Sequence, residues 1–104
     1  MAEVNSALSG TILGESSAKG SPPKAIKTRA AVLQYLKDSF ANTRRAFSSI
    51  TEQNAKLPIK HPLFDMITTR MGLGIVATAH PFDHYGQMVE YLRMNNVVPP
   101  ASLN

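Results

Sequence analysis

Two long stretches of the chain place apolar residues at the three- and four-residue spacing of an amphipathic helix. The first covers about residues 26–50. Its apolar side carries, in chain order, Ile26, Leu33, Leu36, Phe40, Phe47 and Ile50. Charged residues such as Lys37 and Arg45 fall largely on the opposite side. This pattern predicts one helix with a single apolar stripe. Thr28 is a candidate N-cap, and a start just after Pro23 is the alternative.

The second stretch, about residues 68–95, carries two neighbouring apolar stripes. One stripe comprises Met71, Ile75, Thr78, Phe82, Tyr85, Val89 and Leu92, and the other comprises Leu73, Ala77, His80, His84, Met88 and Tyr91. A helix with two adjacent stripes is expected to be buried on much of its circumference. We predict that it ends at the asparagine pair 95–96, because asparagine tolerates the left-handed conformation that closes a helix. Pro99 and Pro100 prevent its continuation.

The remaining segments interrupt both patterns. Residues 1–25 are rich in Gly, Ser, Ala and Pro, which predicts a loop or poorly ordered arm, with short helical turns near residues 4–8 as the alternative. Residues 51–67 contain Pro58 and Pro62 and form a connection of about 15 residues without strand-like alternation. The sequence therefore predicts an all-α chain, with an N-terminal arm at 1–25 and a helical unit at 26–104.

Two long helices alone would be only weakly stable. Ordering about 50 residues costs on the order of 75 kcal/mol of conformational entropy, at ~1.5 kcal/mol per residue. Offsetting that cost requires roughly 3,000 Å² of apolar burial at ~25 cal/mol/Å², and one seam between two helices does not supply it. We therefore expect further partners for the second helix: either the chain self-associates or it belongs to a larger bundle.

Composition narrows the class of protein. The 104 residues suffice for one small domain, and 43% of them are hydrophobic, which indicates a folded chain rather than a disordered one. The absence of cysteine excludes a disulfide framework, a thiolate metal site and a cysteine nucleophile. The formal charge of +4 is too small a surplus to indicate a nucleic-acid-binding surface.

The sequence contains no pattern that predicts export or membrane insertion. The N-terminal run MAEVNSALSGTILG lacks the basic start and the long apolar stretch of a signal peptide. The most apolar window, MGLGIVATA at residues 71–79, is far too short to span a bilayer. We therefore expect a cytoplasmic protein without membrane association.

His80 and His84 are the main candidates for chemistry. Residues four apart on a helix lie one turn apart on the same face, so both imidazoles can face one metal ion. Ordinary hydrogen-bonded histidines in or beside the core are the alternative. Pro81 lacks a backbone donor, so it is expected either inside the helix at a cost in stability or at the start of a new segment after a kink. The residue after His80 is not Glu, which excludes the His-Glu-x-x-His pattern of metalloproteases.

The surroundings of this histidine pair resemble a known family. The run AHPFDHYGQMVEYLRMNNVVPPAS, at residues 79–102, resembles the last helix and tail of the DinB/YfiT-like superfamily of metalloenzymes. The shared elements are Ala-His with a second His four residues on, Asp-His-Tyr-Gly-Gln, Tyr-Leu-Arg-Met-Asn and Val-Pro-Pro-Ala-Ser. Upstream, KTRAAVLQYLKDSFANTRRAFSSI is similar to the third helix of that family, with a less specific motif. The resemblance covers about residues 10–102.

This resemblance implies a bundle of four helices around a divalent metal, commonly zinc or nickel. In the family, three histidines hold the metal, one from the second helix and two from the fourth, and His80 and His84 match the fourth-helix pair. Characterised relatives include thiol-cofactor S-transferases and a mycothiol-dependent isomerase. The implied function is therefore that of a metal-dependent transferase or hydrolase-like enzyme, in which the metal activates a thiol or a water.

Two departures from the family pattern define the alternatives. The first two helices of the bundle are not present upstream, and no histidine precedes residue 60. His61 lies in the proline-framed connection and does not match the family's third ligand, and Pro81 follows the first ligand. We therefore expect the C-terminal half of a DinB-like bundle, which a homodimer would complete by bringing four histidines together. The alternative is a non-catalytic helical oligomerisation or interaction module with a vestigial metal site.

Overall fold

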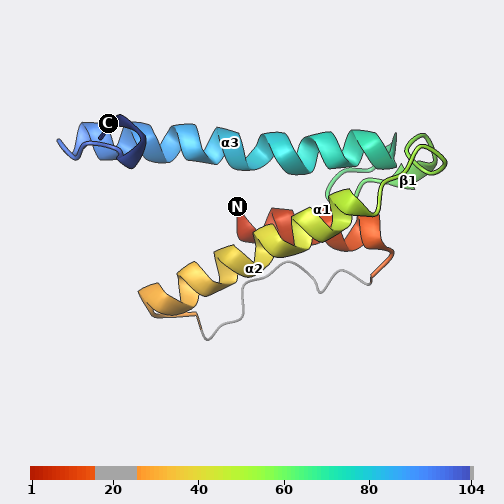
Figure 1. The fold of residues 1–104 in the computed structure, drawn as a ribbon, viewed down its shortest axis with the longest axis horizontal. Helices are drawn as coiled ribbons and strands as arrows, with labels where there is room; N and C mark the ends of the chain where they lie inside the picture. Colours follow the sequence, from red (N-terminus) through yellow and green to blue (C-terminus); the bar gives the residue numbers. More distant parts are fainter. Residues whose placement is uncertain (16–25, 104) are drawn as a thin grey trace.

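A computed structural model describes residues 1–15 and 26–103 of the chain. Its elements, in chain order, are α1 (Ala2–Leu13), α2 (Arg29–Ser48), β1 (Pro58–Lys60), β2 (Ile67–Thr69), α3 (Arg70–Met94) and the 3-10 turn η1 (Pro100–Ser102). The described residues are mainly helical, as predicted. They also contain one short β-hairpin that was not predicted (Figure 1).

Helix α1 lies in the first half of the predicted N-terminal arm. Residues Ala2–Leu13 are helical, so the prediction of a loop at these positions is wrong. Gly14 closes the helix in the left-handed conformation, at φ 69°, and the N–H of Glu15 donates to the carbonyl of Gly10 at 2.9 Å. Gly14, which contributed to the prediction of a loop, is therefore the C-cap of a helix. Residues 16–25 of the predicted arm lie outside the described residues.

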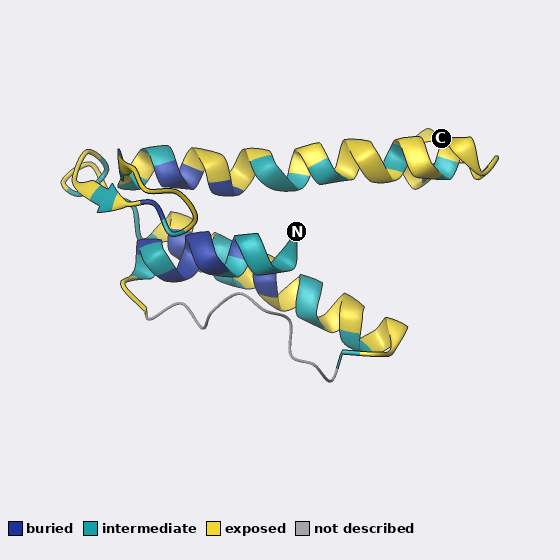
Figure 2. Ribbon diagram, turned by 180° about the vertical axis from the view of Figure 1, so that it is seen from behind, coloured by how far each residue is buried: buried dark blue, intermediate teal, exposed yellow. Residues whose placement is uncertain are grey.

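The core forms where α1 meets the two longer helices. Its fully buried members are Leu8 and Ile12 of α1, Ala46 of α2, and Leu73 and Ala77 of α3. Figure 2 shows the buried turns near the hairpin end of the molecule, while much of α2 and α3 is exposed. Each buried Leu or Ile contributes roughly 1.5–3 kcal/mol through its removal from water. Helix α1 therefore holds the two longer helices together.

Helix α2 has nearly the predicted extent but buries a different face. The hydroxyl of Thr28 accepts a hydrogen bond from the N–H of Ala31 at 3.2 Å, which is the predicted N-cap. The buried residues of α2 are the small Ser39 and Ala46, which allow α1 to approach closely. The predicted apolar stripe is instead partly exposed, with exposed fractions of 45%, 43% and 43% for Leu33, Phe40 and Phe47.

The connection between α2 and α3 contains the hairpin. Strands β1 and β2 pair antiparallel, with Ile59 opposite Thr68. Each strand has only three residues, which is too short for an alternating pattern to be recognised in the sequence. His61 follows β1 and is only 5% exposed, and its Nδ1 accepts a hydrogen bond from the N–H of Leu63 at 3.2 Å. This bond stabilises the turn between the strands.

Helix α3 is continuous from Arg70 to Met94 and includes Pro81 in its interior. Of the two alternatives for Pro81, the structure therefore has the interior position. Pro81 cannot donate the bond that its position would give to the carbonyl of Ala77. At the other end of the helix, Asn96 adopts φ 57°, as predicted for the residue that closes it.

Only the N-terminal part of one of the two apolar stripes predicted on α3 is buried, since Met88 and Tyr91 of that stripe are exposed. Leu73 and Ala77 belong to the stripe that contains the histidines, and both are in the core. Members of the other stripe are exposed, with fractions of 58%, 71% and 46% for Ile75, Phe82 and Tyr85. Within the described residues, the prediction of burial around most of the circumference of α3 is wrong. No fourth helix in residues 1–15 and 26–103 covers the second stripe.

Candidate functional site

The two predicted metal ligands lie beside each other. His80 and His84 stand on consecutive turns of α3, with ring centroids 4.5 Å apart and ring planes at 87°. The unbroken helix through Pro81 maintains this spacing. Bonds from histidine nitrogens to zinc are about 2.0–2.1 Å long, so two imidazoles at this separation can approach one ion.

The ring of His84 is oriented by neighbouring polar side chains. The amide nitrogen of Gln87 donates to Oδ2 of Asp83 at 3.0 Å, so the amide oxygen of Gln87 points toward His84. That oxygen lies 3.2 Å from Nδ1 of His84 and can only accept, so Nδ1 carries the proton. Nε2 of His84 therefore has its lone pair free for a ligand.

His80 is the more enclosed of the two histidines. Its Nε2 is buried and has no hydrogen-bond partner. The pKa of His80 is lowered from its usual value of 6.5, chiefly because burial penalises the charged ring. The charges of His84 and of the Met1 ammonium lower this pKa further, whereas the charge of Asp83 raises it. The neutral imidazole, which this shift favours, is the form that binds a metal.

The described residues bring together two candidate metal ligands but not three. Across residues 1–15 and 26–103, no three His, Asp or Glu side chains are grouped closely enough to hold one ion. Neutral imidazole suits zinc and nickel, so His80 and His84 fit such a metal in donor type. Catalytic zinc sites generally have three protein ligands and one open position. Within the described residues, the pair by itself therefore falls short of the ligand set of a catalytic zinc centre.

The third histidine of the chain does not join this pair. His61 lies in the hairpin, where its ring packs on that of Phe64 with a centroid separation of 4.9 Å. Its Nδ1 already accepts the hydrogen bond from Leu63. Within the described residues, His61 is therefore not grouped with the histidine pair.

Sequence patterns did not draw attention to Asn5. This residue of α1 is fully buried, and neither atom of its side-chain amide has a hydrogen-bond partner. Asn5 follows Met1 by one helical turn, and the Met1 ammonium is close enough to affect His80. Asn5 therefore lies on the part of α1 that approaches the histidine pair. The sequence feature that could have identified Asn5 is its position between the apolar residues Val4 and Leu8, in a segment of apolar and small residues.

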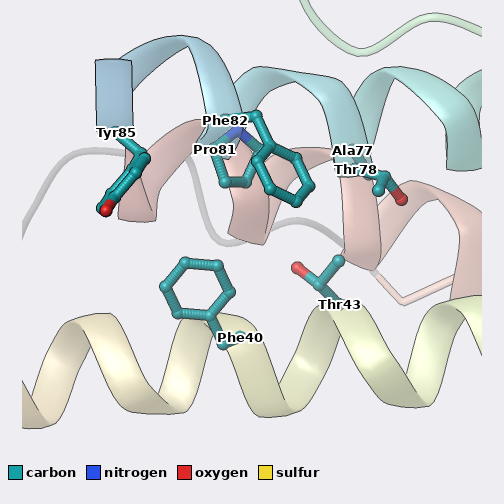
Figure 3. Close-up of a pocket in the computed structure, with 7 residues that line it drawn as sticks. All are labelled: Phe40, Thr43, Ala77, Thr78, Pro81, Phe82 and Tyr85. Atoms are coloured by element: carbon teal, nitrogen blue, oxygen red, sulfur yellow. The ribbon is translucent and has the colours of Figure 1, made fainter. Parts of the chain in front are cut away.

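A groove between α2 and α3 is the second candidate site. Its volume is about 380 Å³, and it is lined by Phe40, Thr43, Ala77, Thr78, Pro81, Phe82 and Tyr85. Figure 3 shows Phe40 of α2 facing Pro81, Phe82 and Tyr85 of α3 across the opening. The walls are almost entirely apolar. Phe40, Ala77, Thr78, Phe82 and Tyr85 were predicted on the apolar stripes of the two helices, and they line an open groove in the structure.

No family model matches the chain, and no curated protein or solved structure matches it. The likeness to the DinB/YfiT-like superfamily is therefore carried only by the sequence runs quoted above. Among the helices of the described residues, none combines the length and the apolar character needed to cross a bilayer.

Proposed function

We propose that this chain is a DinB-like helical protein that binds a divalent transition metal, zinc or nickel, through His80 and His84. The observation that carries the proposal is the arrangement around His84, where Gln87 and Asp83 hold the imidazole with Nε2 free. Histidine ligands of metals are commonly oriented by such a hydrogen bond from their other nitrogen. The buried, unpartnered Nε2 of His80 supports the same interpretation, because a metal bond would satisfy it.

The reaction class in this proposal rests on the resemblance alone. A bound metal would supply the Lewis acidity that lowers the pKa of a thiol or a water, as in a metal-dependent transferase or hydrolase of the thiol-cofactor S-transferase type. In such a site, Gln87 would keep His84 in the correct tautomer, and burial would keep water from Nε2 of His80. Turnover would also require a third ligand from outside the described residues.

Calorimetric titration with zinc and nickel chloride tests the metal proposal. We expect binding with a micromolar dissociation constant, lost in His80→Ala and in His84→Ala. His61→Gln is the matched control, because it removes the one histidine that lies outside the pair and should leave binding unchanged. Circular dichroism would establish that each variant remains helical. Equal binding by the wild type and the His80→Ala/His84→Ala double variant would overturn the proposal.

A second candidate function is supported by a different observation. Large apolar side chains of α2 and α3 are exposed along the groove, which is typical of a surface that binds another protein. In this alternative, the chain is a non-catalytic helical module that forms homo-oligomers, and its metal site is vestigial. Self-association without metal binding would favour this candidate over the first.

A further inference from the structure

The amount of exposed surface indicates that the chain is incomplete as a monomer. A compact monomer of 11.3 kDa exposes roughly 5,700 Å², whereas this chain exposes 7546 Å². Excluding residues 16–25 and 104, with ~1.45 Å² per dalton taken as the most surface that they can contribute, still leaves an excess of roughly 700 Å². Each partner contributes about 800 Å² to a standard interface. The excess is therefore close to what one side of a stable dimer buries.

The exposed apolar surface is continuous across the groove. Phe40 from α2 and Pro81, Phe82 and Tyr85 from α3 form its walls. The 25 residues of α3 extend for about 37 Å, and its C-terminal half reaches beyond α1 (Figures 1 and 2). Phe82 and Tyr85 belong both to the groove and to the uncovered apolar stripe of α3, so the two form one exposed apolar surface.

Charges beside these two surfaces are complementary. On α2, Lys37 and Arg44 line a depression next to Phe40, and neither belongs to an ion pair among the described residues. On α3, Asp83 and Glu90 are exposed. Asp83 accepts a hydrogen bond from Gln87, and Glu90 pairs with Arg93 at 3.2 Å on the same helix. The two bases are seven residues apart on α2 and the two acids are seven residues apart on α3, which is about 10.5 Å along each helix. Two acids of one helix can therefore lie along two bases of another.

We infer that the groove binds helix α3 of a second copy of this chain, in a two-fold symmetric dimer. This inference rests on the second candidate function and specifies its partner and surface. Phe82 and Tyr85 of each copy enter the groove of the other, against Phe40, so that both grooves are filled at once. The acidic side of each α3 then lies along Lys37 and Arg44 of the other copy. Neither His80 nor His84 lines the groove. Asp83 is shared, because it also accepts the hydrogen bond from the Gln87 that contacts His84.

Sedimentation equilibrium of the full chain, over micromolar to hundreds of micromolar concentrations, tests the surface. We expect a wild-type dimer whose dissociation constant rises at least about tenfold in Phe82→Ala/Tyr85→Ala, because aromatic side chains at the centre of an interface dominate its affinity. Met94→Ala is the matched control. Met94 lies on the same helix, is 77% exposed where Phe82 is 71% exposed, and does not line the groove. It should leave the dimer unchanged.

A charge-exchange experiment tests whether the partner is a second copy. Lys37→Glu/Arg44→Glu and Asp83→Lys/Glu90→Lys should each weaken the homodimer, because each places like charges together in both contacts. Mixing the two variants should restore dimerisation, since every contact in the mixed dimer again joins opposite charges.

The outcomes separate this inference from both proposed functions. A monomeric wild type would overturn the inference and the oligomerisation function together. A wild-type dimer that is unaffected by Phe82→Ala/Tyr85→Ala, or equally weakened by Met94→Ala, would overturn this surface and leave self-association standing. Failure of the mixed variants to pair would also overturn it. Loss of metal binding in His80→Ala/His84→Ala with an intact dimer would leave the inference unchanged.

Discussion

The rings of His80 and His84 lie with their centroids 4.5 Å apart and their planes perpendicular, although a proline follows His80 in the sequence. A proline in a helix interior typically costs about 3 kcal/mol. Helix α3 nevertheless continues through Pro81, and the preceding turn is anchored in the core by Leu73 and Ala77. Packing against α1 therefore preserves the one-turn spacing of the two histidines.

Removing the amide that orients His84 should weaken metal binding. We expect Gln87→Ala to raise the dissociation constant for zinc about tenfold, because the free ring no longer favours the tautomer with Nε2 unprotonated. Gln34→Ala is a matched control, since Gln34 makes the same kind of helical bond to Asp38, at 2.8 Å, on α2. Titration calorimetry measures both. Identical affinities for the two variants would mean that Gln87 does not position His84.

Acidification should destabilise the metal-free protein through His80. Its pKa in the folded state is lower than the usual 6.5, first because of burial and then because of His84 and the Met1 ammonium, with Asp83 opposing. The unfolded state therefore binds more protons than the folded state between the two pKa values. The free energy of unfolding falls as the pH decreases through 6.5 toward the folded pKa, and it levels off below that pKa.

The matched variant for this pH effect is His80→Gln, which cannot titrate. Urea unfolding with a chelator present, at pH values above and below 6.5, should show a smaller loss of stability in this variant than in the wild type. The same pH dependence in both proteins would assign the effect to other groups.

The approach of α2 to α3 requires a glycine. A Cβ atom at Gly74 would lie 2.9 Å from Cδ1 of Ile50 and 3.2 Å from Cε2 of Phe47, whereas at Gly86 it would meet nothing within 4 Å. We expect Gly74→Val to lower the free energy of unfolding by about 1–3 kcal/mol. Gly86→Val should change it by less than about 0.5 kcal/mol. Denaturant unfolding curves measure both, and equal effects would contradict the proposed close contact.

Replacing the buried amide of Asn5 should stabilise the fold. Leaving a buried amide unpaired costs about 1–3 kcal/mol, and both amide atoms of Asn5 lack partners. We expect Asn5→Ala to raise the free energy of unfolding by about 1 kcal/mol more than Asn42→Ala. The second variant controls for the higher helix propensity of alanine, because Asn42 lies within α2. A loss of stability in Asn5→Ala would show that the amide is satisfied in solution.

Several features of the fold followed from short-range patterns in the sequence. The spans of α2 and α3 were predicted to within a few residues, and so were the Thr28 cap and the closing position of Asn96. The adjacency of His80 and His84 followed from the four-residue spacing. Helix α1 was missed because Ser9, Gly10 and other small residues in it suggest a loop, whereas in the fold their small size allows close packing.

The sequence by itself therefore determined the helical periods, the helix ends and the spacing of the histidines, because each depends on residues within about one turn of one another. Only the tertiary structure decided which face of each long helix is buried. The stripe that contains Phe82 is the more apolar of the two on α3, yet α1 covers the one with Leu73 and Ala77 while Phe82 remains exposed. That choice depends on which surfaces meet in space, and contacts between distant segments leave no local pattern in the chain.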